Sequence, residues 1–254
     1  MFISVPFVRR ASSAPALRRG RATLTSALCL ALSACATTSP LLRQQCYDAD
    51  AQLAAVLTPL EQARAAGCGA SAVKSGESDC VRLRTELDRL MVVCPGHAPT
   101  LVANAVFAYE ERQPVKAQQL LDQVLSEPRS YPDAAVLRAR IAVEDGNVPF
   151  ARRLLEQHIR LAPDHAGLHE TYGAALYLEG QLPEAARELQ MAQLLGAPAW
   201  RIAYHLGLID EAAGRVDDAI RRYTESLAAN PDSALARSRL NALRARAGAG
   251  LQSR

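Results

Sequence analysis

The sequence lacks the short motifs that identify several common enzyme classes. It contains no G-x-x-x-x-G-K-[ST] phosphate-binding loop, no H-E-x-x-H zinc motif and no G-x-S-x-G nucleophile motif. Glu110 and Glu111 are adjacent, so they point to different sides of a helix and do not form an acid–base pair. We therefore expect neither an enzyme nor a cofactor.

The histidines also lack an arrangement that favours a metal site. His165 and His169 are four residues apart, a spacing that places two ligands on one face of a helix. However, they lie around Pro163 and Gly167, where we expect one helix to end and the next to begin. We therefore predict no metal site.

Excess positive charge is confined to the N-terminal region. The formal net charge of the chain is +3, but residues 1–34 contain five arginines and no acidic residue. The rest of the chain therefore carries a formal charge of −2, which gives no basis for nucleic-acid binding.

The N-terminal region has no apolar stretch long enough to span a bilayer. Its apolar segment, residues 22–34, has 13 residues, whereas a spanning helix needs about 20. An arginine-rich start followed by this segment is typical of a secretory signal. The sequence "LSAC", which ends at Cys35, resembles the bacterial lipobox. This resemblance implies that Cys35 carries lipid, and Ala36 after it favours the outer membrane. The alternative is that Cys35 is an ordinary small residue of a signal peptide.

Residues 98–233 repeat with a period of 34 residues. Two positions of the repeat hold small residues, a third holds a large one, and a fourth holds a turn glycine: Ala105, Ala139, Gly173 and Gly207; Ala117, Ala151, Ala185 and Ala219; Leu121, Leu155, Leu189 and Tyr223; Gly146, Gly180 and Gly214. Glycine readily ends a first helix, and the Asn230-Pro231 pair ends a second one. We predict that the two helices cross closely at Gly207 and Ala219, with Leu206 and Tyr223 filling the space beside them.

This pattern resembles the tetratricopeptide repeat (TPR), a helix–turn–helix unit with small residues at positions 8, 20 and 27. The four units begin at Ala98, Pro132, Ala166 and Trp200. The first unit has Arg112 in place of the turn glycine, and in the second His158 takes a position that prefers a small residue. The resemblance implies an all-α fold, a right-handed superhelical solenoid of TPR units. A generic helical bundle is the alternative.

In this family the first helices of the units line a concave groove that binds protein segments. The resemblance places the groove residues at positions 2, 5, 9 and 12 of the units: Val102, Val106, Tyr109, Val136, Arg140, Val143, Glu170, Ala174, Tyr177, Arg201, Tyr204, Leu208 and Glu211. Aromatic and aliphatic residues with a few charges suit a peptide segment. The lysine and asparagine set that holds a peptide C-terminus in some relatives is absent. The alternative is that the tyrosines only pack against neighbouring helices.

Residues 42–97 contain four cysteines in a predicted helical segment: Cys46, Cys68, Cys80 and Cys94. An exported chain meets an oxidising compartment, so an even number of cysteines favours disulfides. If 42–66 and 79–94 form an antiparallel hairpin, Cys46 pairs with Cys94 and Cys68 with Cys80. Zinc is the alternative, but the cysteines are not in close pairs. A capping box at Thr58–Glu61, with Pro59 at the first helical position, predicts that a helix starts or restarts there.

The predicted layout has five parts: a lipoprotein signal peptide (1–34), a lipidated N-terminus and linker (35–41), a cysteine-containing helical segment (42–97), four TPR units (98–233), and a capping helix and tail (234–254). In the last part, Leu235, Leu240 and Leu243 recur at helical spacing and the arginines form a solvated face.

This layout predicts a non-enzymatic scaffold or adaptor, anchored in the outer membrane by lipid and facing the periplasm. Pilus systems use TPR lipoproteins of similar size, and the scaffolding of cell-wall enzymes is an equal alternative within this class. Two other classes remain open: a self-associating structural module, and a small envelope enzyme in residues 42–97.

Overall fold

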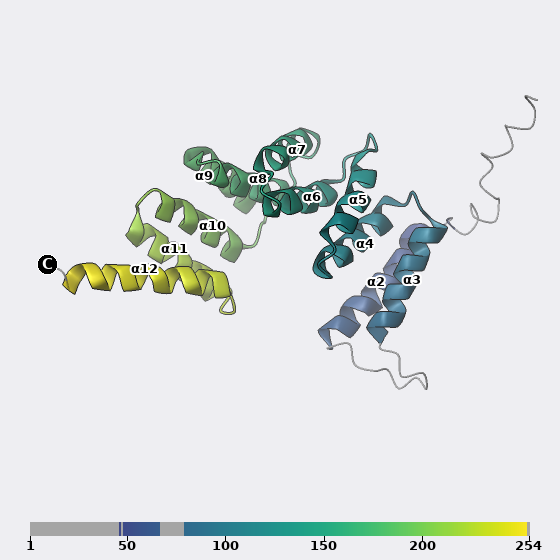
Figure 1. Ribbon diagram of the computed structural model, residues 1–254, viewed down its shortest axis with the longest axis horizontal. Helices are drawn as coiled ribbons and strands as arrows, with labels where there is room; N and C mark the ends of the chain where they lie inside the picture. Colours follow the sequence, from purple (N-terminus) through teal and green to yellow (C-terminus); the bar gives the residue numbers. More distant parts are fainter. Residues whose placement is uncertain (1–45, 47, 67–78, 253–254) are drawn as a thin grey trace, which may run out of the picture. The chain divides into compact units, whose positions relative to one another are not determined.

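The computed structural model describes residues 46, 48–66 and 79–252, and all regular structure in these ranges is helical (Figure 1). In chain order the helices are α2 (Ala49–Ala65), α3 (Asp79–Val93), α4 (Ala98–Glu110), α5 (Pro114–Leu125), α6 (Pro132–Glu144), α7 (Val148–Leu161), α8 (Ala166–Leu178), α9 (Leu182–Leu194), α10 (Ala199–Ala212), α11 (Val216–Ala229) and α12 (Ala234–Gln252). None of these helices is long and apolar enough to cross a bilayer. Cys35 and Cys68 lie outside the described residues.

Eight helices form four consecutive pairs, from α4–α5 to α10–α11, and the predicted all-α repeat architecture is confirmed. The turns within the pairs follow the predicted glycine pattern. Gly146, Gly180 and Gly214 have φ angles of 78°, 78° and 75°, in the left-handed region that glycine adopts without strain. Arg112 takes the same conformation in the first unit, with φ of 61°. For a non-glycine residue this conformation costs about 1 kcal/mol.

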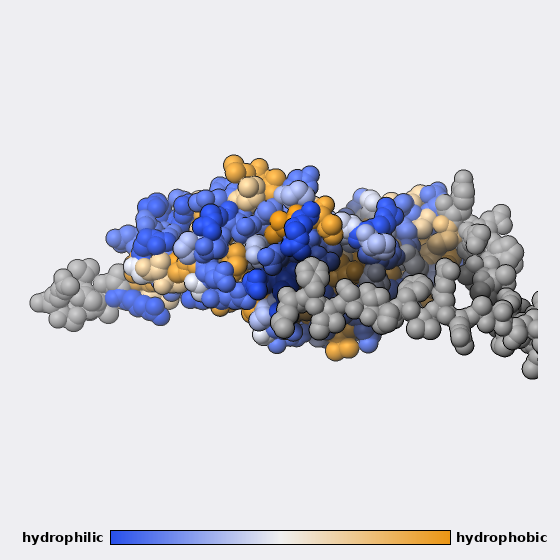
Figure 2. Space-filling view, turned by 90° about the horizontal axis from the view of Figure 1, so that it is seen from above, coloured by the Kyte–Doolittle hydropathy of each residue, from blue (hydrophilic) through white to orange (hydrophobic). Residues whose placement is uncertain are grey.

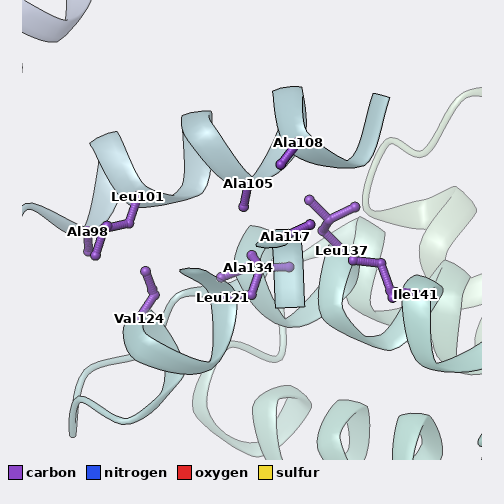
Figure 3. Packing of buried hydrophobic residues seen from close by; sticks show 10 residues of the cluster. All are labelled: Ala98, Leu101, Ala105, Ala108, Ala117, Leu121, Val124, Ala134, Leu137 and Ile141. Atoms are coloured by element: carbon purple, nitrogen blue, oxygen red, sulfur yellow. The ribbon is translucent and has the colours of Figure 1, made fainter. Parts of the chain in front are cut away.

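Small residues allow the two helices of a unit to approach closely. Figure 3 shows Ala105 of α4 pointing toward α5, which contributes Ala117 and Leu121. All three side chains are completely buried. They belong to a core that also includes Ala134 at the start of α6, so each unit packs on the next through the same apolar layer.

The close contact in the fourth unit differs in detail from the prediction. A Cβ atom on Gly207 would lie 2.6 Å from Cε1 of Tyr223, so the tyrosine ring fills the space that the glycine leaves. The contact is therefore with Tyr223 rather than with Ala219. In the third unit, a Cβ on Gly173 would lie 2.9 Å from Cγ of Leu189 and 3.1 Å from the carbonyl oxygen of Ala185.

The N-terminal helices α2 and α3 form a hairpin that the structure closes with a disulfide between Cys46 and Cys94. The two Cα atoms are 5.4 Å apart, and the pairing is the one that the antiparallel hairpin predicted. The Cys68–Cys80 pairing stays a prediction, because Cys68 lies outside the described residues.

The prediction that a helix starts or restarts at Thr58 and Pro59 is wrong. Helix α2 runs without interruption from Ala49 to Ala65, and Pro59 lies inside it. A proline in this position removes one backbone hydrogen bond. Leu53 and Leu60, one on each side of the proline, are 7% and 2% exposed, so packing holds both halves in one helix.

Helix α12 covers the end of the fourth unit. Leu240 and Leu243 are buried in one cluster with Tyr223 and Leu208. Leu235, which we expected on the same face, is 65% exposed, and Ala236 takes the buried position instead. The side chain of Leu235 is therefore available to the groove described next.

Candidate partner-binding groove

A groove of about 420 Å³ crosses the first helices of the second, third and fourth units and reaches the start of α12. We call it the first-helix groove. Its lining residues are Val136, Arg140, Val143 and Glu144 of α6; Gly167, Glu170, Thr171 and Ala174 of α8; Trp200, Arg201, Tyr204 and His205 of α10; and Leu235 of α12. The 34-residue repeat places these residues at equivalent positions of successive units, which is why they line one surface.

Seven residues that the repeat register predicted for the groove are brought together in it: Val136, Arg140, Val143, Glu170, Ala174, Arg201 and Tyr204. The other six do not line it, for two different reasons given below. The part of the chain that the structure describes therefore places the groove toward the C-terminal units.

An ion pair joins α8 and α10 at the groove. The Nη2 atom of Arg201 lies 2.6 Å from Oε2 of Glu170, whose side chain is 10% exposed. The Nε2 atom of His205 is 3.8 Å from Oε1 of the same carboxylate. Burial lowers the pKa of His205 to about 4, and the charge of Arg201 acts in the same direction. His205 is therefore neutral at pH 7.

Hydrogen bonding at the α6 side of the groove leaves one cation without a partner. The Tyr109 hydroxyl donates to Oε1 of Glu144, and this bond is the main reason why the pKa of Tyr109 is raised. Arg140, one turn before Glu144, is exposed and has no hydrogen bond or ion pair with any residue that the structure describes. The groove thus presents a guanidinium that the chain itself does not neutralise.

Three predicted groove residues at the C-terminal end contact α12 or its neighbours instead of lining the groove. Leu208 is 8% exposed, and Tyr177 packs against the same cluster as Leu240 of α12. Glu211 accepts a hydrogen bond from the Tyr223 hydroxyl at 2.9 Å and lies 3.5 Å from Nη1 of Arg239. The placement of these three in an open groove is corrected, because α12 covers this end of the surface.

Three predicted residues of the first unit also lie outside the first-helix groove. Val102 lines a separate apolar pocket of about 360 Å³, together with Leu53 and Leu57 of α2. Val106 is 37% exposed, and Tyr109 is held by Glu144. The N-terminal hairpin therefore contributes to a pocket that the sequence assigned to the first repeat alone.

Sequence reasoning missed Glu144, Trp200, His205 and Leu235 as lining residues. Leu235 stands 34 residues after Arg201, so the repeat register itself contained the signal. That signal was overlooked because we assigned α12 only a covering role. No comparable periodic signal marks Glu144 or His205, whose positions depend on the angles between neighbouring helices.

The remaining histidines have structural partners. His165 Nε2 lies 3.2 Å from Oδ1 of Asp133, and His169 Nδ1 lies 2.7 Å from Oε2 of Glu188. Buried His158 has a Nδ1 atom without a hydrogen-bond partner, and burial lowers its pKa. Among the described residues, no group of three or more metal-ligating side chains occurs.

Exposed apolar residues do not by themselves mark a second binding surface. Leu194 and Val92 are 81% and 74% exposed, but they belong to different helices, α9 and α3. On the face seen in Figure 2, apolar residues form separate groups surrounded by hydrophilic ones. Single exposed residues of this kind are usual on folded domains.

Comparison with solved structures identifies the fold. The chain is similar to TTC0263, a thermophilic TPR protein in Thermus thermophilus, at 19% identity and a TM-score of 0.59, over 74% of this chain and 96% of that one. A MamA protein matches at 15% identity and a TM-score of 0.50, over 72% of this chain and 94% of that one. The APC/C hetero-tetramer Cut9–Hcn1 matches at 15% identity and a TM-score of 0.51, over 64% of this chain and 39% of that one.

No protein-family model matches the chain, and no curated protein does. The structural likenesses, at these low identities, establish the fold alone. The chain has the all-α TPR fold that its 34-residue pattern indicated.

Proposed function

We propose that this TPR-fold protein is a non-enzymatic scaffold or adaptor of the bacterial cell envelope that binds a segment of a partner protein in the first-helix groove. The observation that carries the proposal is the groove itself. Four helices contribute to it, it has a volume of about 420 Å³, and it combines apolar walls with charged groups. A groove with these properties suits an extended or helical peptide.

A named structure supports a protein partner by analogy. One similar structure is a complex between Cut9 and Hcn1, and TPR folds in general present such surfaces to other chains. Fold alone does not determine function, so the envelope role rests on the targeting signals in residues 1–35. These signals favour a protein that is lipid-anchored through Cys35 in the outer membrane and faces the periplasm.

The first experiment is capture of partners with a groove variant as its control. The full chain carries a C-terminal tag, membranes are solubilised in mild detergent and crosslinked, and co-purifying proteins are identified by mass spectrometry. Ala174→Arg places a long charged side chain in the groove, because Ala174 is a partly exposed lining residue. Arg153→Glu, on the outer side of the second unit at an exposed position of α7, is the matched control.

We expect a pilus, secretion or cell-wall component that Ala174→Arg loses and Arg153→Glu retains. Retention of the same partners by Ala174→Arg contradicts the groove as the binding surface. Capture of the chain's own second copy, with light scattering that depends on concentration, supports the self-associating module instead.

The lipid anchor is tested separately. Labelling with a radioactive fatty acid and membrane fractionation compare the natural chain with Cys35→Ala. We expect the label and the membrane association to be lost together, since stable anchoring depends on the acyl chains. An unlabelled natural chain in the soluble periplasmic fraction contradicts the anchor but leaves the groove proposal intact.

A further inference from the structure

The unpaired polar groups of the first-helix groove are mainly hydrogen-bond donors. Arg140 is exposed and has no partner among the described residues. Arg201 uses Nη2 for Glu170, while 42% of its side-chain surface stays accessible. The hydroxyl of Tyr204 has no hydrogen-bond partner in the described part of the chain either. These groups favour a ligand that supplies acceptors.

The carboxylates of the groove already have donors. Glu170 receives Arg201, and Glu144 receives the hydroxyl of Tyr109. His205 is neutral at pH 7, so it adds no positive charge. Arg140 is thus the groove cation that lacks a counter-charge, although Glu144 lies one turn further along the same helix. Among biological acceptors a carboxylate forms one of the strongest bonds with a guanidinium, often through two parallel hydrogen bonds.

The walls around these groups are apolar. Val136 and Val143 line the α6 side, Trp200 lines the α10 side, and Leu235 of α12 lines the end of the groove with 65% of its surface exposed. A large aliphatic or aromatic side chain placed here removes apolar surface of both molecules from water. The walls therefore select an apolar residue beside the acidic one.

We propose that the groove selects peptide segments in which an aspartate or glutamate lies close to a large apolar residue. The carboxylate pairs with Arg140, and the apolar side chain packs against Val136, Trp200 and Leu235. This specificity rests on the proposed function, because it assumes that the partner segment occupies the first-helix groove. It adds the chemistry that the segment must carry.

The test uses a phage-displayed library of random peptides and the purified full chain in mild detergent. Phage are selected on the natural chain and depleted on Ala174→Arg, so that groove-dependent binders remain. Thr171→Arg is the second blocking variant, used if circular dichroism shows that Ala174→Arg does not fold. Selected peptides are then synthesised in pairs that differ only by Glu→Gln or Asp→Asn, and their affinities are measured by fluorescence polarisation.

We expect the selected peptides to contain an acidic residue near an aromatic or aliphatic one. Removing the peptide's charge weakens binding to the natural chain about tenfold, which is usual for a well-placed charged hydrogen bond, and high salt reduces the difference. Arg140→Gln removes most of this preference for the acidic form. Arg153→Gln, which changes an exposed arginine of the same repeat unit, keeps it.

Two results overturn the inference in distinguishable ways. If groove-dependent peptides bind equally well in acidic and amide forms, the specificity is wrong while the proposed binding function stands. If no selected peptide distinguishes the natural chain from the blocking variants, the groove does not bind peptides and both proposals fail.

Discussion

The N-terminal hairpin and the fourth repeat unit are both antiparallel helix pairs, but they are held together by different means. In the fourth unit, Gly207 leaves room for the ring of Tyr223, and Ala219 beside it is completely buried. In the hairpin, Leu83 stands 34 residues before Ala117, so a large residue occupies a position that the repeats keep small. The hairpin helices instead share the Cys46–Cys94 disulfide.

Polar contacts connect the hairpin to the first unit. Arg84 Nη1 donates to Oδ1 of fully buried Asn104 at 2.7 Å. The guanidinium carbons of Arg64 and Arg84 lie 5.1 Å and 5.2 Å from the ring centre of Phe107, within cation–π range. Contacts between successive units are mainly apolar by comparison. The difference teaches that a covalent bond and specific polar contacts replace close helix packing where the repeat pattern is incomplete.

The largest expected effect comes from opening the disulfide. Cys46→Ser removes a bond that joins residues 48 apart in sequence, and closure of a loop of this length stabilises a protein by about 4 kcal/mol in the chain-entropy account. We expect α2 and α3 to lose hydrogen-exchange protection while α8 to α11 keep theirs. Equal loss of protection in the repeats would show that the two regions unfold as one unit and would break the comparison.

The next effect concerns close packing in the fourth unit. Gly207→Ala introduces a Cβ only 2.6 Å from the ring of Tyr223, and we expect a loss of about 2 kcal/mol, because overpacking outweighs the higher helix propensity of alanine. Chemical denaturation measures it. Gly96→Ala is the control, since a Cβ there meets no atom within 4 Å.

A double variant sharpens this prediction. Gly207→Ala combined with Tyr223→Leu recreates the alanine–leucine pair that the first two units use at the same positions, such as Ala105 with Leu121. We expect the double variant to be more stable than Gly207→Ala alone. If it is less stable, the contact between the glycine and the tyrosine is not what limits the size of residue 207.

A smaller effect depends on pH and concerns the second unit. Burial lowers the pKa of His158, which is 4% exposed, below its ordinary value of 6.5. The unfolded chain therefore binds a proton more readily than the folded one, and stability present above pH 6.5 is lost as the pH falls through the folded pKa. We expect a loss of about 1 kcal/mol.

The matched variant is His158→Val, because the equivalent residue of the first unit is buried Val124. Thermal unfolding of both proteins is compared between pH 7 and pH 5. We expect the variant to lose less stability on acidification than the natural chain, although buried His205 still contributes. Identical pH dependence in the two proteins contradicts a role for His158.

The smallest expected effect is stabilising. Arg112 adopts a φ of 61° where the other units have glycine. Arg112→Gly relieves left-handed strain but makes the unfolded chain more flexible, so we expect a net gain of about 0.5 kcal/mol. Equilibrium denaturation in urea measures it. The reverse change, Gly146→Arg, is expected to destabilise, and a stabilising outcome there contradicts the shared role of this turn position.

Much of the repeat architecture follows from local sequence features. A glycine that permits positive φ and a small residue at a helix crossing act within one unit, so their 34-residue spacing predicted the helix pairs. The errors have equally specific causes. At Pro59 a local capping signal competed with burial of Leu53 and Leu60 on both sides, and burial prevailed. At Leu208 and Glu211 the register was right, but α12 covers both residues.

By itself the sequence determined where the repeated helices lie and which residues face the first-helix side, because helix periodicity and turn chemistry depend on neighbours along the chain. Only the tertiary structure decided which of those residues remain available. Arg140 stays unpaired among the described residues, while Glu211 meets Tyr223 and Arg239 and Tyr109 meets Glu144. These differences depend on contacts between helices from different parts of the chain, and no spacing within one unit encodes them.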